Sequence, residues 1–237
     1  HPDAEDCAGV PAPMYIKCTA DADAFRWSHD SDREPFRLGG NSGATECIDI
    51  DNDGDIDLLT GEIVHWDVGS SSDPSELALN EGGPDVKLTR PGNEVTGLAR
   101  EHKGVDWNDG IMTGSAFDFD NDGWPDVYLG ASDYPGNHGL LFHQDTPGHF
   151  EPVPIAQGID HHRSHGSAVA DFDHDGDLDI VVGHSRARCD ANSPDDCYPT
   201  SQVRFFENVI GQKGHFLQLT LTGAPGTNRA AIGARVT

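Results

Sequence analysis

Short apolar runs alternate with Gly-rich and Asp-rich segments along this chain, and the same order of segments occurs three times. Each copy has one apolar run that ends in Gly, and these runs are "LLTG" at 58–61, "VYLG" at 127–130 and "IVVG" at 180–183. A second apolar or aromatic run with a Gly-bearing turn follows in each copy: "ELALNEGG" at 76–83, "GLLFHQDTPGHF" at 139–150 and "VRFFENVIGQKGHF" at 203–216. The runs are too short for typical helices, have the usual length of strands, and are rich in strand-forming residues.

This pattern predicts an all-β protein built from repeats. Each copy reads as one hairpin followed by an outer hairpin, and four antiparallel strands in about 50 to 60 residues make a β-propeller blade. We therefore expect an N-terminal segment at 1–40 and a repeat region at 41–215. The three blades are expected at about 41–95, 110–157 and 163–215, and degenerate strands are possible within 1–40 and 84–110.

An acidic segment of nine residues separates the first two strands of each copy. The segments are "DIDNDGDID" at 49–57, "DFDNDGWPD" at 118–126 and "DFDHDGDLD" at 171–179, here called the first, second and third acidic loops. Counted from the first residue of the loop, positions 1, 3, 5 and 9 are always Asp and position 6 is always Gly. The Gly permits a sharp reversal that would fold positions 1, 3 and 5 around one point. Position 7 accepts Trp, which indicates that this position contributes its backbone carbonyl.

Carboxylates in this number favour calcium, which takes 6 to 8 oxygen ligands in flexible geometry. Magnesium demands a stricter octahedron, and zinc or copper would favour His or Cys. An EF-hand would place Glu at position 12, where this chain has Thr60, Leu129 and Val182. Asp-Gly turns without an ion are the alternative, and three copies of one pattern favour the metal. We predict about three Ca²⁺ ions, held by Asp49, Asp51, Asp53, Asp55, Asp57, Asp118, Asp120, Asp122, Trp124, Asp126, Asp171, Asp173, Asp175, Asp177 and Asp179.

The charge balance narrows the classes of partner. The 237 residues include 41 acidic and 15 basic side chains, a formal net charge of -26. Such a surface argues against nucleic acid and against anionic membranes, and it fits a soluble, secreted or cation-binding protein. No apolar run approaches the roughly 18 residues of a membrane span. No converging set of titratable groups indicates catalysis, so we expect a protein that is not an enzyme.

The chain has five cysteines, and their pairing indicates the redox state of the compartment in which the protein resides. Cys189 and Cys197 flank the polar segment "DANSPDD", and Cys7 and Cys18 flank another short segment. Two local disulfides are predicted, which implies an oxidising compartment, extracellular or periplasmic. Five free thiols are the alternative. Cys47 stands beside Ile48 in an apolar run, and we expect it to be a buried free thiol.

The segment "HHRSH" offers a possible second metal site. His161, His162 and His165 are ligands of the kind that zinc and copper prefer. Solvated histidines beside an acidic surface are the plainer alternative. If the metal site exists, an enzyme or a copper or zinc accessory protein is the second candidate function.

The "DxDxDGxxD" loops, each followed by apolar residues and Gly, resemble the FG-GAP or VCBS repeats of calcium-binding β-propellers. The segment "FLQLTLTGAPGTNRAAIGARVT" at 216–237 resembles the start of the ASPIC/UnbV module, and together they resemble the secreted cartilage-acidic-protein-like family. The resemblance implies a propeller, commonly of about seven blades, followed by the start of a small β module. It also implies extracellular binding, adhesion or surface assembly with a protein or glycan ligand. Three loops are fewer than seven blades, so we expect a partial propeller that contacts other chains or continues in further sequence.

Overall fold

The structure is a computed structural model, and it describes residues 42–65, 75–84, 87–99, 108–132, 137–187, 189, 197–213, 215–217, 219–231 and 234. The predicted N-terminal segment, with Cys7 and Cys18, lies outside the described residues. In chain order the elements are β1 (Ser42–Ile48), β2 (Asp57–His65), β3 (Glu76–Asn80), β4 (Leu88–Thr89), α1 (Asn93–Thr96), β5 (Asn108–Gly110), β6 (Gly114–Phe117), β7 (Asp126–Leu129), β8 (Leu140–Thr146), β9 (His149–Pro152), η4 (Ile155–Gln157), β10 (Ser164–Ala170), β11 (Asp179–His184), β12 (Gln202–Phe206) and η5 (Gly211–Lys213).

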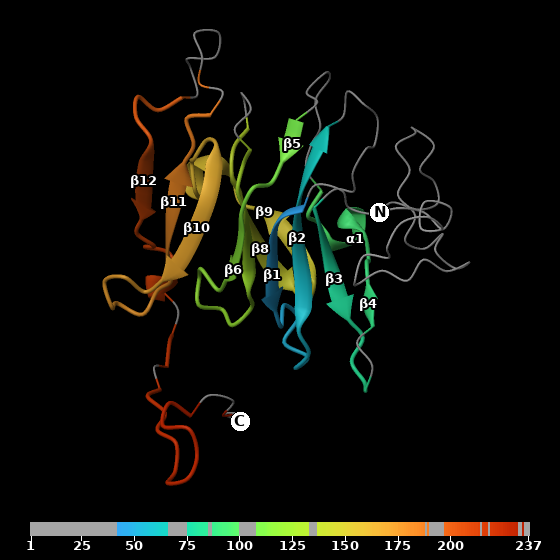
Figure 1. Ribbon diagram of the computed structural model, residues 1–237, viewed down its shortest axis with the longest axis vertical. Coiled ribbons are helices and arrows are strands. Elements are labelled where there is room, and N and C mark those ends of the chain that lie inside the picture. The colour runs from blue at the N-terminus through green and yellow to red at the C-terminus, as the bar shows by residue number, and fades with distance from the viewer. Residues whose placement is uncertain are drawn as a thin grey trace, which may run out of the picture.

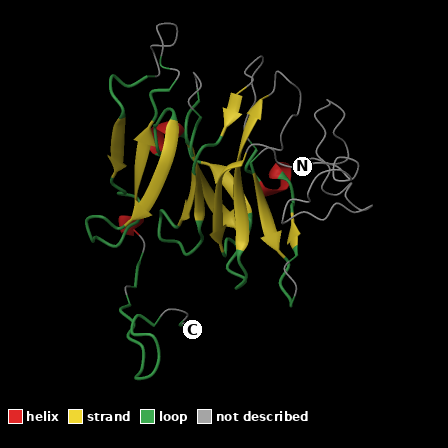
Figure 2. Cartoon of the chain, viewed as in Figure 1, coloured by secondary structure: helices red, strands yellow, loops and turns green. Residues whose placement is uncertain are grey.

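Strands dominate the structure and form three antiparallel sheets that stand side by side (Figures 1 and 2). The first sheet has the order β1-β2-β3-β4, with β5 paired to the end of β2; the second has the order β6-β7-β8-β9; the third is β10-β11-β12. Each sheet begins with a hairpin, and the acidic loop forms the tip of that hairpin. The predicted all-β class is therefore confirmed, while the described residues do not form a closed ring of blades.

The three hairpins share one register. The residue before each acidic loop pairs with loop position 9, and these pairs are Ile48 with Asp57, Phe117 with Asp126, and Ala170 with Asp179. Successive side chains of a strand point to opposite faces of its sheet. A shared register therefore places equivalent loop residues on the same face in every sheet.

One apolar core lies between the first and second sheets. Ile50, Leu59 and Leu77 of the first sheet belong to one buried cluster with Val127 and Phe142 of the second, and each of the five side chains is at most 2% exposed. Removing this apolar surface from water stabilises the sheet-on-sheet contact, by roughly 1.5–3 kcal/mol for each large side chain.

A second core lies on the opposite face of the second sheet. Phe119, Tyr128 and Leu141 gather there with Ile180 and Val182 of the third sheet. The second sheet is thus covered on both faces, and its central strand β7 is buried along its whole length. Such burial explains why β7 reads in the sequence as a continuous apolar run and not as an alternating one.

The structure bears on three further expectations, which concern the disulfide, Cys47 and the C-terminal module. Cys189 and Cys197 form the predicted disulfide. The Cys47 thiol is free, but the prediction that it is buried is wrong, because the side chain is exposed. Neighbouring residues of a strand point to opposite faces, and in this strand Ile48 is the one that packs against the first core. The described part of the third sheet has three strands, and the residues described after η5 form no strand of a C-terminal β module.

Among the described residues, no helix is long and apolar enough to cross a membrane.

Candidate metal centre

The three acidic loops adopt one backbone conformation. Position 4 has a positive φ in every copy, 58° at Asn52, 58° at Asn121 and 64° at His174. The Gly at position 6 follows with φ values of 99°, 97° and 99°. Asn and His enter this left-handed region more readily than most residues, and Gly enters it without strain. The sequence indicated why position 6 is Gly, whereas the left-handed backbone conformation of position 4 was not predicted.

Position 9 braces each hairpin against the third strand of its sheet. The carboxylates of Asp57, Asp126 and Asp179 are at most 1% exposed. Each accepts two backbone N–H groups, one from loop position 2 and one from a residue within or just after the third strand of the sheet. The donors are Ile50 (2.9 Å) and Asn80 (2.7 Å), Phe119 (2.9 Å) and Gln144 (2.7 Å), and Phe172 (3.1 Å) and Asn208 (2.8 Å). Position 9 therefore has a structural role that spacing alone did not reveal.

Positions 1 and 5 face the turn of their own loop. The position 1 carboxylate accepts the N–H of the position 6 Gly, at 3.0 Å for Asp49, 2.8 Å for Asp118 and 3.2 Å for Asp171. The position 5 carboxylate accepts the N–H of position 7 at 2.8–3.0 Å in all three loops. These bonds hold the position 1 and position 5 carboxylates beside the reversal.

Carboxylate oxygens converge in the first two loops. One oxygen from each of Asp49, Asp51 and Asp53 lies within 4.8 Å of the other two, and the carboxylates of Asp118, Asp120 and Asp126 do the same. Within the described structure, Asp49 Oδ1 and Asp120 Oδ1 are buried without a hydrogen-bond donor. Burial, followed by the neighbouring carboxylates, raises the pKa of Asp51 and of Asp120. A hard cation would offset this repulsion, so the donor set fits calcium.

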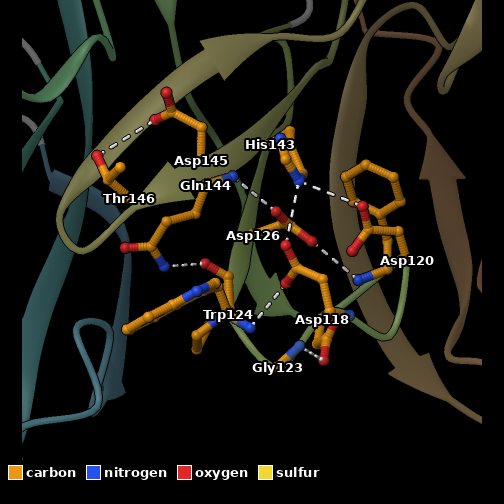
Figure 3. A network of polar contacts seen from close by, with 12 residues as sticks. Asp118, Asp120, Gly123, Trp124, Asp126, His143, Gln144, Asp145 and Thr146 are labelled. Carbon is orange, nitrogen blue, oxygen red and sulfur yellow. Dashed lines mark hydrogen bonds and ion pairs between the residues drawn. The ribbon is translucent and has the colours of Figure 1, made fainter. Parts of the chain in front are cut away.

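A ligand candidate that the sequence reasoning missed lies beside the second loop. His143 lies on β8, and its Nε2 is 3.2 Å from Asp120 Oδ2 and 3.5 Å from Asp122 Oδ2 (Figure 3). Asp120 also belongs to the group with Asp126, where burial raises the pKa of Asp126 to about 7 against the lowering effect of its two backbone hydrogen bonds. No local feature of "GLLFHQD" marks His143 as a neighbour of the second loop, because the contact depends on the pairing of β8 with β7.

Position 7 side chains lie outside these groups of carboxylates. The indole of Trp124 points away from Asp120 and Asp126 in Figure 3. The carboxylate of Asp177 accepts the amide of Asn121 from the neighbouring loop at 2.9 Å. The carboxylate of Asp55 lies beside Gly82, where an added Cβ would be 2.5 Å from its oxygen. This placement agrees with the predicted use of the position 7 carbonyl, which stays a prediction.

Hydrogen bonds connect each acidic loop to the next, and we call them the inter-loop ladder. Asn52 Nδ2 of the first loop donates to the carbonyl of Gly123 in the second at 2.9 Å, and Asn121 Nδ2 donates to the carbonyl of Gly176 in the third at 3.4 Å. Position 4 thus binds position 6 of the following loop in both cases.

A second set of side-chain amides completes the ladder from the opposite direction. Gln144 Nε2 donates to the carbonyl of Ile50 at 2.9 Å, and Asn208 Nδ2 donates to that of Phe119 at 2.6 Å. Both acceptors are position 2 of the preceding loop. The same amides also bond position 8 of their own loop, so each fixes two loops at once. Their sequence signal was an amide residue that lies one or two residues after the first apolar stretch of the second run in each copy.

The three histidines of "HHRSH" have different surroundings. His161 is fully buried, with its Nδ1 3.1 Å from the Ser164 hydroxyl, and His165 is exposed. His162 lies against His138, with ring centroids 3.9 Å apart. Burial, followed by the neighbouring positive charges, lowers the pKa of His161 to about 4, so its ring stays neutral at pH 7.

Comparison with known protein families matches residues 118–182 to the FG-GAP-like repeat. The matched segment contains the second and third acidic loops together with the strands between them, and the first loop lies outside it with the same backbone conformation. No curated protein matches the chain. Residues 118–182 therefore carry an FG-GAP-like repeat, as the loop pattern predicted.

Proposed function

We propose that this protein is a secreted calcium-binding β-propeller protein that acts in extracellular binding, adhesion or surface assembly and not in catalysis. The observation that carries the proposal is the repetition of one loop conformation with inward-facing carboxylates in three sheets. The inter-loop ladder supports the propeller, because it relates each sheet to the next by the same pair of contacts. We further propose, from the resemblance of 216–237, that the blades lead into an ASPIC/UnbV module.

In this proposal each loop holds one Ca²⁺ through the carboxylates of positions 1, 3 and 5 and the carbonyl of position 7. Position 9 contributes where its carboxylate reaches the group, as Asp126 does in the second loop. The ion supplies positive charge that offsets carboxylate repulsion and makes the loop rigid. Extracellular or periplasmic residence is supported by the Cys189–Cys197 disulfide, which persists in an oxidising compartment.

Calcium titration calorimetry on chelator-treated protein tests the proposal. We expect uptake of about three ions, and each site should stabilise the fold by roughly 2.7 kcal/mol when free calcium is 100 times the dissociation constant. Asp122→Ala should remove or weaken one site because position 5 donates its side chain. Trp124→Ala is the matched control, since position 7 donates only its backbone. Absence of calcium uptake by the wild type, or three tight sites in Asp122→Ala, would refute the proposal.

The partner surface that we propose is the outer face of the third sheet. Phe172 and Phe205 are exposed there by 47% and 49%, and their rings contact each other edge to face. In the first sheet the equivalent residues are Ile50 and Leu77, which are at most 1% exposed because the second sheet covers them. The positions that bury one sheet against the next are thus open on the third sheet. The fitting partner is another sheet of the same repeat, and a second copy of this chain can supply it.

Sedimentation velocity over a range of concentrations tests this partner. The wild type should associate, and Phe205→Lys should remain monomeric with unchanged calcium uptake. Val95→Lys is the control, because Val95 is 64% exposed on α1, away from the third sheet. A wild type that stays monomeric throughout, or an equal loss of association in the control, would contradict self-association through this face.

A further inference from the structure

A mixed cluster of histidines and a carboxylate lies apart from the acidic loops. One ligand atom from each of His138, Asp160 and His162 lies within 4.8 Å of the other two. His138 Nδ1 is 3.4 Å from Asp160 Oδ1, and His162 Nε2 is 4.0 Å from the same oxygen. The cluster neighbours the start of β10 and the end of β11, whereas the third acidic loop joins the end of β10 to the start of β11.

Backbone contacts fix the two segments that carry these side chains. His138 and His162 form an antiparallel β-bridge, and the N–H of Gly139 donates to the carbonyl of His161 at 3.0 Å. The paired backbone positions bring the two imidazole rings to a centroid distance of 3.9 Å. Asp160 stands two residues before His162, and in extended chain such residues share a side. The three donors therefore come from two segments that already contact each other.

The neighbouring strand also holds His162 in place. His184, the last residue of β11, lies with its Nδ1 2.9 Å from the carbonyl oxygen of His162, and as the N–H tautomer it donates to that oxygen. The side chains of His138 and His162 are 31% and 22% exposed, and that of Asp160 is 65% exposed. The cluster is thus anchored through its backbone, with the His138 Nδ1 atom buried and the Asp160 side chain largely exposed.

The donor set determines which metal fits. Two imidazole nitrogens and one carboxylate oxygen are ligands that zinc prefers, whereas calcium and magnesium prefer oxygen alone. Tetrahedral zinc with bonds of about 2.0–2.2 Å separates its ligand atoms by roughly 3.3–3.6 Å. The two distances to Asp160 Oδ1 are 3.4 and 4.0 Å, and all three ligand atoms lie within 4.8 Å of one another, so side-chain adjustment would bring them to this spacing. We propose that His138, Asp160 and His162 bind a divalent first-row transition metal of the zinc type, independently of calcium.

This assignment leaves the metal one coordination position for a ligand other than the protein. An open fourth position is typical of catalytic zinc sites, which have three protein ligands, whereas structural sites are closed by four. The acidic net charge of -26 would favour the approach of any divalent cation. Selection of zinc over calcium then depends on the two imidazoles.

Zinc titration calorimetry in saturating calcium tests the proposal, because calcium occupies the acidic loops beforehand. The wild type should bind one Zn²⁺. His162→Gln and Asp160→Asn should each raise the dissociation constant for zinc by at least about tenfold. His215→Gln is the matched control, since this exposed histidine lies beyond η5 and outside the cluster. Asp160→Asn alters an exposed carboxylate, so its calcium titration should match the wild type and show that the fold persists.

Cobalt provides a second readout of the ligands. Co²⁺ bound by this donor set should give a visible absorption band that stoichiometric Zn²⁺ abolishes and that both cluster variants lack. A wild type that binds no zinc in saturating calcium would overturn the assignment. Wild-type zinc affinity in His162→Gln and Asp160→Asn, or an equal loss in His215→Gln, would overturn it as well.

Discussion

Asn121 connects the second acidic loop to the third, and its replacement by Ala should destabilise the protein measurably. Its Nδ2 donates to Asp177 Oδ1 at 2.9 Å and also contacts the carbonyls of Gly176 and Gly211 at 3.4 and 3.2 Å. Asp177 is 1% exposed, and burial raises its pKa while the Asn121 amide opposes that shift. Loss of the amide removes a donor from a buried carboxylate.

The expected loss has two parts. A hydrogen bond to a charged group contributes about 1.5–3 kcal/mol to the free energy of unfolding. Asn121 also has φ 58°, and placing Ala in this left-handed region costs roughly 1–2 kcal/mol. Asn121→Ala should therefore lose about 2.5–5 kcal/mol, and Asn121→Gly only the first part, because Gly adopts this φ without strain.

Asn52→Ala is the matched comparison, since Asn52 also has φ 58° but donates to a neutral carbonyl in an exposed position. The backbone strain of Ala at positive φ is then the same in both variants and cancels from their difference. A hydrogen bond to a neutral group contributes only about 0.5–1.5 kcal/mol to the free energy of unfolding. Asn121→Ala should be the less stable of the two by roughly 1–1.5 kcal/mol.

Urea unfolding at saturating calcium measures these differences by linear extrapolation. For a chain of this size, each kcal/mol lowers the melting temperature by about 2–4 °C. If Asn121→Gly is as stable as the wild type, the bond to Asp177 contributes nothing. If Asn121→Ala and Asn52→Ala lose equal stability, the charged acceptor has no special role. Either result would refute the reasoning.

Two other predictions concern a turn and an exposed ion pair. Gly97→Ala should lower the free energy of unfolding by about 2–5 kcal/mol, because Gly97 has φ 78° and an added Cβ would lie 1.9 Å from the carbonyl oxygen of Phe150. Gly83→Ala should lower it by only about 1–2 kcal/mol, because Gly83 has φ 103° but open space around it. Equal losses of melting temperature in the two variants would contradict this. The hydrogen bond from His149 Nδ1 to Asp145, at 2.7 Å, raises the pKa of His149 above 6.5, so Asp145→Asn should return the NMR titration of this ring toward 6.5. Because folding raises the pKa of His149, the contact with Asp145 stabilises the fold below pH 6.5, and this stabilisation fades as the pH rises through the folded pKa. The pair is exposed, so its effect on the melting temperature should be small. An unchanged His149 titration in Asp145→Asn would exclude the contact.

The sequence predicted those features of the loops that have local causes. Gly54 reverses the first loop, and one carboxylate oxygen from each of Asp49, Asp51 and Asp53 lies within 4.8 Å of the other two. Strand type followed equally well from the length and composition of the apolar runs. Cys47 shows the limit, because an apolar neighbour in sequence lies on the opposite face once the segment is a strand.

Features that depend on long-range register could not be predicted. The N–H of Gln144 that meets Asp126 lies 18 residues further along the chain, and His143 approaches the second loop only because β8 pairs with β7 in one register. The pairing of His138 with His162 depends on a single bridge between distant segments. Spacing in "HHRSH" instead directed attention to neighbouring histidines, of which His161 is buried and His165 is exposed.

The inter-loop ladder has a consequence for the shape of a binding curve. Asn52 can bond Gly123 only when both loops hold their turns. If calcium binds as proposed, uptake that orders one loop should therefore favour the ordered state of its neighbour. Sites connected in this way behave as a one-dimensional series of nearest neighbours, and the coupling free energy between two sites is reciprocal. The middle loop has two neighbours and each outer loop has one. A calcium titration should then be steeper than three independent sites allow, and an empty middle loop should leave the first and third loops filling without influence on each other.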